Sequence, residues 1–172
     1  PCYEESNIPI FKEVYAEIGD EQSIENNLST FSSHMLNTAN IIANADKESL
    51  VLLDEVGSGT DPAEGAALGV AMLEALKEKG AHIVATTHYT ELKKYALSTD
   101  GVENASMEFD MDALAPTYRI KVGLPGKSNA FEISRKLGLE PSIIDRAISL
   151  MNESDIEFEG AVSRVEEDQK EV

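Results

Sequence analysis

The chain has 172 residues, of which 42% are apolar and 27% are charged, as is ordinary for a soluble globular domain with a core of its own. Its formal net charge of −18 makes this chain by itself a poor ligand of nucleic acids, because DNA affinity depends mainly on Lys and Arg side chains that neutralise phosphates. The single cysteine, Cys2, excludes an intrachain disulfide. No run reaches the roughly 18 apolar residues of a membrane span and no signal peptide is evident, so we expect a cytoplasmic protein without membrane contact. The chain begins at Pro1 without a methionine, and we expect it to be a fragment or a processed product.

The first part of the chain predicts a strand, a loop and a helix. Pro9 to Ile18 alternates loosely between apolar and polar residues and predicts a strand, and the acidic stretch from Asp20 to Asn27 predicts a loop. A helix is expected to begin near Ser29, because Ser29 and Thr30 are both suitable N-caps. Its buried face is expected to hold the side chains that recur at helical spacing, namely Phe31, Met35, Thr38 and Ile42.

A strand–helix–strand unit follows. Leu50 to Leu53 is wholly apolar, as expected of a buried parallel strand. The sequence Asp61-Pro62-Ala63-Glu64 combines an N-cap, a proline at the first helical position and a capping-box acid, and predicts a helix that reaches Lys79 and stops at Gly80. Ile83 to Ala85 lies in the next buried strand. This strand–helix–strand unit should be a right-handed crossover between parallel strands, as in an α/β fold.

The second half of the chain predicts a hairpin and several helices. A short helix is expected from Tyr89 to Leu97. Two half-buried, antiparallel strands are expected at Val102–Phe109 and Thr117–Val122, because apolar residues alternate along both. Two short helices, Asn129–Leu137 and Pro141–Met151, should be separated by Gly138. From Asn152 onward the chain is acidic and is either a frayed tail or the start of a longer helix, so we divide it into residues 1–151 and 152–172.

Two adjacent carboxylates, Asp54 and Glu55, follow the buried strand at Leu50–Leu53. Ligands of open α/β folds bind at the carboxyl ends of parallel strands, where this pair is expected to lie. The first acid of such a pair typically holds Mg²⁺, which prefers a few carboxylates with phosphates and retained waters. The second is placed to polarise the water that attacks a γ-phosphate. The alternative is that both are solvated acids at the end of a strand.

The three histidines differ in their surroundings. His88 follows the strand at Ile83–Ala85 and is placed to donate a hydrogen bond to a γ-phosphate oxygen. His34 is expected on a helix surface and His82 at a strand edge. Ser29 and Thr30 open a helix whose free backbone N–H groups suit a phosphate, but from the residues alone Ser29 is only a cap.

Asp54, Glu55 and His88 have the layout of the Mg²⁺ and hydrolysis half of an ATP site, but the sequence contains no complete phosphate-binding loop motif. Gly126-Lys127-Ser128 matches only the end of that motif, because the position of its first glycine is occupied by Lys121. A strand-to-helix turn is the better interpretation of this segment. The sequence therefore predicts part of an ATPase.

Taken together, LVLLDEVGSGTDP, STFSSHM and ATTHYTEL resemble the ATPase domain of MutS-type proteins, within the ABC-ATPase superfamily. The stretch IGDEQSIENNLSTFSSHM resembles specifically the second bacterial MutS branch. The resemblance covers roughly Ile10 to Ala147. It implies a P-loop NTPase fold of three layers that is incomplete here, with a mainly parallel sheet, helices on both faces and additional C-terminal helices. The segment with the Walker A motif would precede Pro1.

The resemblance also implies roles for single residues. Asp54 would be the Walker B ligand of Mg²⁺, Glu55 the catalytic base and His88 the switch histidine. Ser29, with Thr30, would match the signature that reaches the γ-phosphate bound by a partner subunit. The loop that faces the opposite subunit would consist of Gly59, Thr60 and Asp61.

The implied cofactors are ATP and Mg²⁺, and the implied assembly is a homodimer that ATP binding closes and hydrolysis releases. In the family this assembly acts on DNA, in mismatch recognition or in suppression of recombination, and a role at ribosomes is also discussed for the second branch. The acidity of this chain assigns any DNA contact to other parts of the protein. Two alternatives stay open: another ABC-type ATPase, although NNLSTF differs from the usual LSGGQ, or a non-catalytic dimerisation module.

Overall fold

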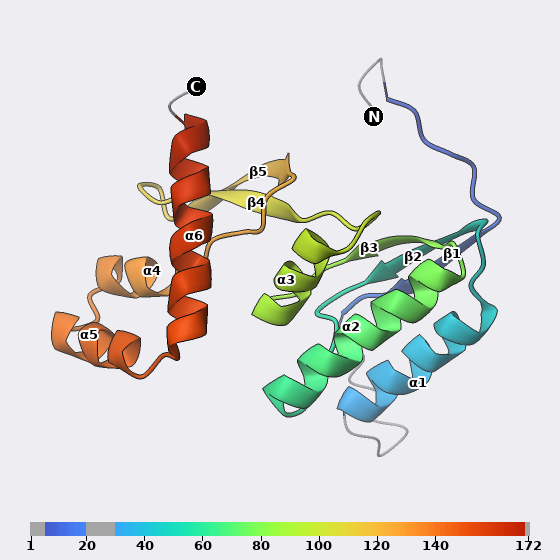
Figure 1. The fold of residues 1–172 in the computed structure, drawn as a ribbon, viewed down its shortest axis with the longest axis horizontal. Coiled ribbons are helices and arrows are strands. Elements are labelled where there is room, and N and C mark those ends of the chain that lie inside the picture. The colour runs from blue at the N-terminus through green and yellow to red at the C-terminus, as the bar shows by residue number, and fades with distance from the viewer. Residues whose placement is uncertain (1–5, 20–29, 171–172) are drawn as a thin grey trace. The chain divides into compact units, whose positions relative to one another are not determined.

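The structure is a computed structural model that describes residues 6–19 and 30–170. The chain divides into two compact units, one up to Leu92 and one from Lys93. Figure 1 shows the elements of both. The predicted loop from Asp20 to Asn27 and the predicted N-cap Ser29 lie outside the described residues.

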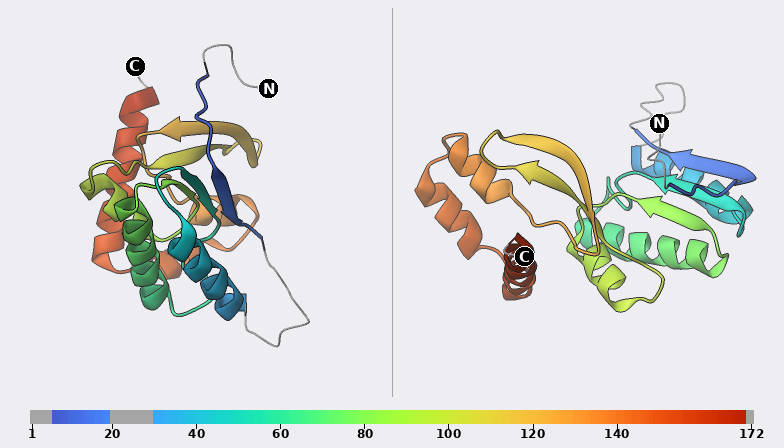
Figure 2. Two further views of the ribbon diagram at one scale, coloured as in Figure 1. Left: turned by 90° about the vertical axis from the view of Figure 1, so that its right-hand side faces the viewer. Right: turned by 90° about the horizontal axis from the view of Figure 1, so that it is seen from above.

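The first unit contains a three-stranded parallel sheet in the order β1-β2-β3, with a helix after each of the first two strands. Both crossover helices lie side by side on one face of this sheet (Figure 2). A third helix begins at the end of the unit and continues into the second. The elements are β1 (Glu13–Glu17), α1 (Thr30–Asn44), β2 (Ser49–Leu53), α2 (Pro62–Glu78), β3 (His82–Ala85) and α3 (Thr90–Ser98).

The core of this unit lies between the central strand and the two crossover helices. Val51 and Leu53 of β2 point to the helical side and are 0% and 4% exposed. They meet Ile41 of α1 and Ala66 and Leu76 of α2 in one buried apolar cluster. The wholly apolar run thus forms the central strand that the sequence predicts, and its burial fixes the position at which the acid pair begins.

The start and end of α2 follow from local sequence signals. The Asp61 carboxylate accepts hydrogen bonds from the backbone N–H groups of Ala63 and Glu64, at 3.0 and 3.2 Å, and Pro62 occupies the first helical position. Beyond the last turn, Gly80 adopts a φ of 77°, which a side chain would disfavour. Both predicted ends of this helix are confirmed.

Two features of the first unit differ from the sequence-based expectation. The first strand is shorter than Pro9–Ile18, because only Glu13 to Glu17 pair with β2. The sheet face away from α1 and α2 is open among the described residues, and Val14 and Val84 on it are both 59% exposed. The second helical layer of the expected three-layer fold is therefore not among the described residues of this unit.

The second unit contains a two-stranded antiparallel sheet and three helices after it. The elements are β4 (Ala105–Asp110), β5 (Ala115–Val122), α4 (Ala130–Lys136), α5 (Pro141–Ser149) and α6 (Glu153–Lys170). The hairpin and the two short helices confirm the predictions, and the acidic C-terminal stretch is helical rather than frayed. In the part of this unit that the structure describes, no helix is both long and apolar enough to cross a bilayer, and the same holds for the first unit.

The expectation that the hairpin is half-buried is wrong for one of its faces. Met107, Ile120 and Val122 are 54%, 65% and 68% exposed, and Met107 lies directly opposite Ile120 in the ladder. Alternation places such side chains on one face, but it does not say whether another part of the protein covers that face.

Candidate functional site

The acid pair lies at the carboxyl end of β2, as predicted. Asp54 is half-buried and Glu55 is exposed. Glu55 has a φ of 47°, a left-handed conformation that a non-glycine residue rarely adopts. A cavity at this end of the sheet is lined by both acids, by residues 56–58, and by side chains of β1 and α1 that include Glu17, His34 and Thr38. The acids therefore face a hollow rather than open solvent alone.

The end of the neighbouring strand is tied to the acid pair through Thr86. The Glu55 backbone N–H donates to the Thr86 hydroxyl oxygen at 2.9 Å, and the hydroxyl donates to Asp54 Oδ1. The backbone of Thr86 pairs with the same turn, from its N–H to the Leu53 carbonyl at 2.9 Å and from the Val56 N–H to its carbonyl at 3.0 Å. Thr86 was not predicted from the sequence, although its place just after the strand at Ile83–Ala85 and two residues before His88 could have indicated it.

The expectation for His34 is wrong. His34 does not lie on a free helix surface: its Nδ1 contacts Glu17 Oε1, and the two side chains are only 17% and 8% exposed. The pair joins α1 to the end of β1 and lines the same cavity as the acids. Helical periodicity places His34 correctly in α1 but contains no information on the strand residue that meets it. His82 lies at the start of the edge strand β3, as expected, with its ring 5.1 Å from that of Phe11.

The loop that follows the acids contacts α1, the first turn of α2 and Tyr89. Gly57 (φ 82°) lies so close to the first turn of α2 that its carbonyl would be 2.2 Å from a Cβ on Gly65. The same carbonyl accepts a hydrogen bond from the buried Tyr89 hydroxyl at 3.2 Å. Gly59 (φ 88°) lies against Phe31 at the start of α1. The predicted subunit-facing residues Gly59, Thr60 and Asp61 thus lie in the segment that connects the acids to α2 and passes the start of α1. Asp61 is the N-cap of α2.

His88 lies beyond the end of β3, with an exposed side chain. Its ring packs on that of Tyr89, with the ring centroids 4.6 Å apart. Two residues close to His88 in the sequence contact the segment that bears the acids: Thr86 donates a hydrogen bond to Asp54, and Tyr89 donates one to the Gly57 carbonyl. The structure places Asp54, Glu55 and His88 at the carboxyl edge of the same sheet.

The signature residues are described only in part. Thr30 is the first residue of α1, and its side chain is not among those described; Ser29 precedes the described segment. Their predicted contact with a γ-phosphate stays a prediction.

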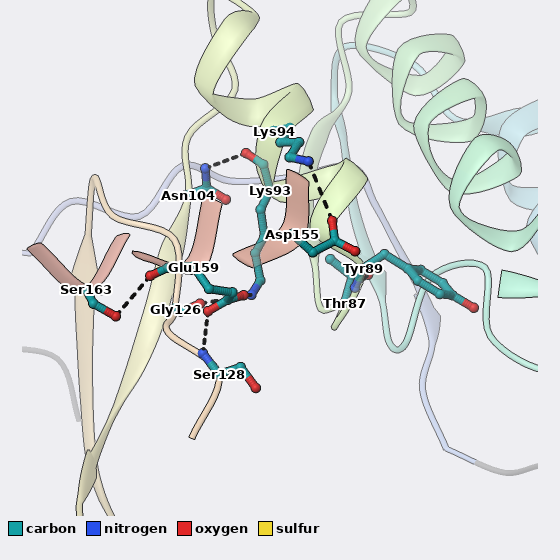
Figure 3. Close-up of polar contacts among 10 residues, drawn as sticks. All are labelled: Thr87, Tyr89, Lys93, Lys94, Asn104, Gly126, Ser128, Asp155, Glu159 and Ser163. Carbon is teal, nitrogen blue, oxygen red and sulfur yellow. Dashed lines mark hydrogen bonds and ion pairs between the residues drawn. The ribbon is translucent and has the colours of Figure 1, made fainter. Parts of the chain in front are cut away.

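The segment Gly126-Lys127-Ser128 lies in the connection between β5 and α4, which accords with the strand-to-helix turn expected from the sequence. The Lys93 ammonium donates to the Gly126 carbonyl at 2.9 Å, and the Ser128 backbone N–H donates to Glu159 at 2.9 Å (Figure 3). Lys127 lies 3.5 Å from the Glu132 carboxylate. The Ser128 N–H group therefore already donates to the Glu159 carboxylate and is not available to a phosphate.

The chemistry of the acid pair fits Mg²⁺. One Asp54 oxygen is engaged by a hydroxyl, which leaves the second oxygen for a cation. Within residues 6–19 and 30–170, no group of three or more His, Cys, Asp or Glu side chains is placed to hold a metal alone. A single carboxylate completed by phosphate oxygens and water is the kind of site that Mg²⁺ prefers.

Comparisons with known proteins identify the family of the chain. The family model described as MutS domain V matches residues 1–155. Endonuclease MutS2 of Clostridium beijerinckii is 59% identical over 167 residues, which cover 97% of this chain and 21% of that protein. Endonuclease MutS2 of Clostridium acetobutylicum is 60% identical over 166 residues, and that of Lachnospira eligens 58% identical over 166 residues, each covering 96% of this chain and 21% of the relative.

The chain thus spans about a fifth of the length of the curated relatives it matches. The matched region includes every strand of the parallel sheet and the acid pair at its carboxyl edge. The chain therefore belongs to the MutS domain V family, in its MutS2-like branch, and has the α/β fold of a P-loop ATPase.

Proposed function

We propose that this chain is the part of an ATP-hydrolysing domain that binds Mg²⁺ and activates water, in a DNA-maintenance protein of the MutS family. One observation supports this most directly. Two adjacent acids follow the buried central strand of a parallel sheet, and the hydroxyl of the residue just after the neighbouring strand engages the first of them. Ligands of open α/β folds bind at that edge.

Each residue has a distinct role in this proposal. Asp54 holds Mg²⁺ through the oxygen that Thr86 does not engage. Glu55 accepts a proton from the water that attacks the γ-phosphate, and its exposure leaves it open to that water. His88 donates a hydrogen bond to a γ-phosphate oxygen. The bound cation would neutralise charge that develops on the phosphate oxygens.

The proposed catalytic unit is a homodimer. Ser29 and Thr30 of one subunit would reach the γ-phosphate of the other, and Gly59, Thr60 and Asp61 would face the opposite subunit. The proximity of Gly59 to Phe31 supports a single surface formed by both segments. ATP would then hold two subunits together, and hydrolysis would release them.

DNA is the proposed substrate of the intact protein, through mismatched or branched structures or in the suppression of recombination. The relatives are named endonucleases, a class of enzymes that cleave nucleic acids, which supports a nucleic-acid substrate for the intact protein. The net charge of −18 assigns the DNA contact to other parts of the protein, since phosphate binding needs Lys and Arg. A ribosomal role stays a further proposal for this branch.

Steady-state ATP hydrolysis by the full-length protein tests the proposal. Glu55→Gln should lower turnover by about 10²–10⁴-fold, because it removes the general base at nearly constant volume. Glu78→Gln makes the same chemical change at the exposed end of α2 and should leave turnover unchanged. Equal turnover in Glu55→Gln and wild type would refute the assignment. A dimer that forms equally well with and without ATP, by mass measurement, would favour the non-catalytic dimerisation module.

A further inference from the structure

Thr86 makes an unusual set of contacts for a residue just beyond the end of a strand. Its backbone N–H, its backbone carbonyl and its hydroxyl all bond to the segment from Leu53 to Val56. The two backbone bonds continue the β2–β3 pairing beyond its last partners, Leu53 and Ala85. The position of the hydroxyl is therefore set by the sheet and not by a mobile loop.

The direction of the two hydroxyl hydrogen bonds is fixed by their chemistry. A backbone N–H can only donate, so the N–H of Glu55 uses a lone pair of Thr86 Oγ1, at 2.9 Å. A carboxylate can only accept, so the single hydroxyl proton of Thr86 goes to Asp54 Oδ1. The hydroxyl thus connects the first acid's carboxylate to the second acid's backbone.

The conformation of Glu55 shows why such a connection is useful. Its φ of 47° is one that a non-glycine residue adopts only when neighbouring groups hold it there. The hydrogen bond from its N–H to Thr86 is one such restraint. Left-handed backbone at this point sets the direction in which the Glu55 side chain leaves the chain.

We propose that Thr86 is a positioning residue: its hydroxyl orients the Asp54 carboxylate toward Mg²⁺ and holds Glu55 in its left-handed conformation. The inference rests on the proposed ATPase function of the acid pair. Groups that orient a metal ligand through a hydrogen bond typically affect metal affinity by 10–100-fold when they are removed. A hydroxyl that only satisfied the end of a strand would not affect metal affinity.

The test uses the full-length protein with a non-hydrolysable ATP analogue, and Mn²⁺ as a paramagnetic substitute for Mg²⁺. Titration followed by electron paramagnetic resonance gives the Mn²⁺ affinity without any turnover. Thr86→Val removes the hydroxyl and keeps the branched shape, and should weaken Mn²⁺ binding by about 10–100-fold. Thr86→Ser keeps the hydroxyl and should restore most of that affinity.

Thr99→Val is the matched control, because it makes the same change in the second unit, at a turn where the Thr99 carbonyl accepts the N–H of Val102. It should bind Mn²⁺ as wild type does. Should Thr86→Val fail to fold by circular dichroism, Thr86→Ala removes the same hydroxyl with less bulk and is measured in the same way.

Asp54→Asn distinguishes a failure of the proposed role of Thr86 from a failure of the proposed function of the acid pair. If Asp54→Asn abolishes Mn²⁺ binding while Thr86→Val binds as wild type does, the role of Thr86 is refuted and the acid site stands. If Asp54→Asn also binds as wild type does, the proposed function of the acid pair fails, and the role of Thr86 fails with it. Loss of affinity in Thr86→Val with recovery in Thr86→Ser supports the proposal.

Discussion

At the scale of single residues, the turn after the acids depends on two glycines in contact. A Cβ on Gly57 would lie 2.2 Å from the Gly65 carbonyl oxygen, and a Cβ on Gly65 would lie 2.2 Å from that of Gly57. Gly57 also has a φ of 82°. The segment that bears Asp54 and Glu55 can therefore approach the first turn of α2 only without side chains at these two positions.

Gly57→Ala should lower the free energy of unfolding by more than the cost of placing an alanine in a left-handed backbone conformation. Gly138 has a φ of 93°, but beyond its two chain neighbours a Cβ on it would meet no atom of the described residues within 4 Å, so Gly138→Ala should cost only the roughly 1–2 kcal/mol of a left-handed alanine. Gly57→Ala adds a backbone clash to that cost. Urea denaturation of both variants measures the difference, and equal losses of stability would contradict the close contact.

A second residue-scale prediction concerns Asp46 in the turn before β2. The pKa of its carboxyl is lowered from 3.8, first by the hydrogen bond from the Glu48 N–H and then by that from the Ser49 hydroxyl. A pKa lowered in the folded chain means that the ionised form stabilises the fold. This contribution is complete above the ordinary pKa and is lost as the pH falls through the folded value.

Asp46→Asn keeps an oxygen acceptor in this turn but cannot ionise. It should be less stable than wild type at neutral pH, and the difference should shrink as the pH falls below 3.8, the ordinary pKa of the group. Unfolding free energies measured across this range test the prediction. A difference that does not change with pH would show that the charge of Asp46 has no role in stability.

The positions of site residues were predictable from sequence where the signal is local, but their contacts with distant partners were not. Asp54 and Glu55 follow an apolar run, so their place at a sheet edge could be inferred. The contacts of Thr86 with Asp54, and of His34 with Glu17, join residues 32 and 17 positions apart. Nothing in the periodicity of either segment identifies such a partner.

At the scale of elements, α2 is the helix whose limits the sequence defines most sharply. Its N-cap, its first proline and its terminal glycine are all local signals, and all three act as predicted. The limits of β1 depend instead on pairing with β2, which a local pattern does not contain. The exposure of the β4–β5 hairpin depends on what covers it, which is also not local.

Substitutions of Asp61, the N-cap of α2, can distinguish its role in stability from its proposed role at the subunit interface. Asp61→Ala removes the acceptor for two backbone N–H groups and should cost about 1 kcal/mol of stability. Asp61→Asn caps a helix as well as aspartate does and should be nearly neutral in thermal denaturation. If both variants lose ATP turnover in the full-length protein, the charge of Asp61 acts at the subunit interface. Equal stability of Asp61→Ala and wild type would contradict the cap.

At the scale of the whole molecule, the chain spans about a fifth of the length of its relatives. This accords with a sheet that shows one open face among its described residues, where Val14 and Val84 are exposed. The proposed function also requires a phosphate-binding loop beside Asp54 and Glu55. In the proposed function, these residues act within a larger ATPase domain and, through it, in a dimer.

The most direct test of this account identifies the nucleotide that the full-length protein retains after incubation with labelled ATP and Mg²⁺. Wild type should hold mostly ADP, because Glu55 activates the attacking water. Glu55→Gln should bind ATP with similar affinity and hold it intact, because Asp54 and the rest of the site are unchanged. ADP formed at the wild-type rate in Glu55→Gln would contradict the central claim that this acid pair is a hydrolytic centre.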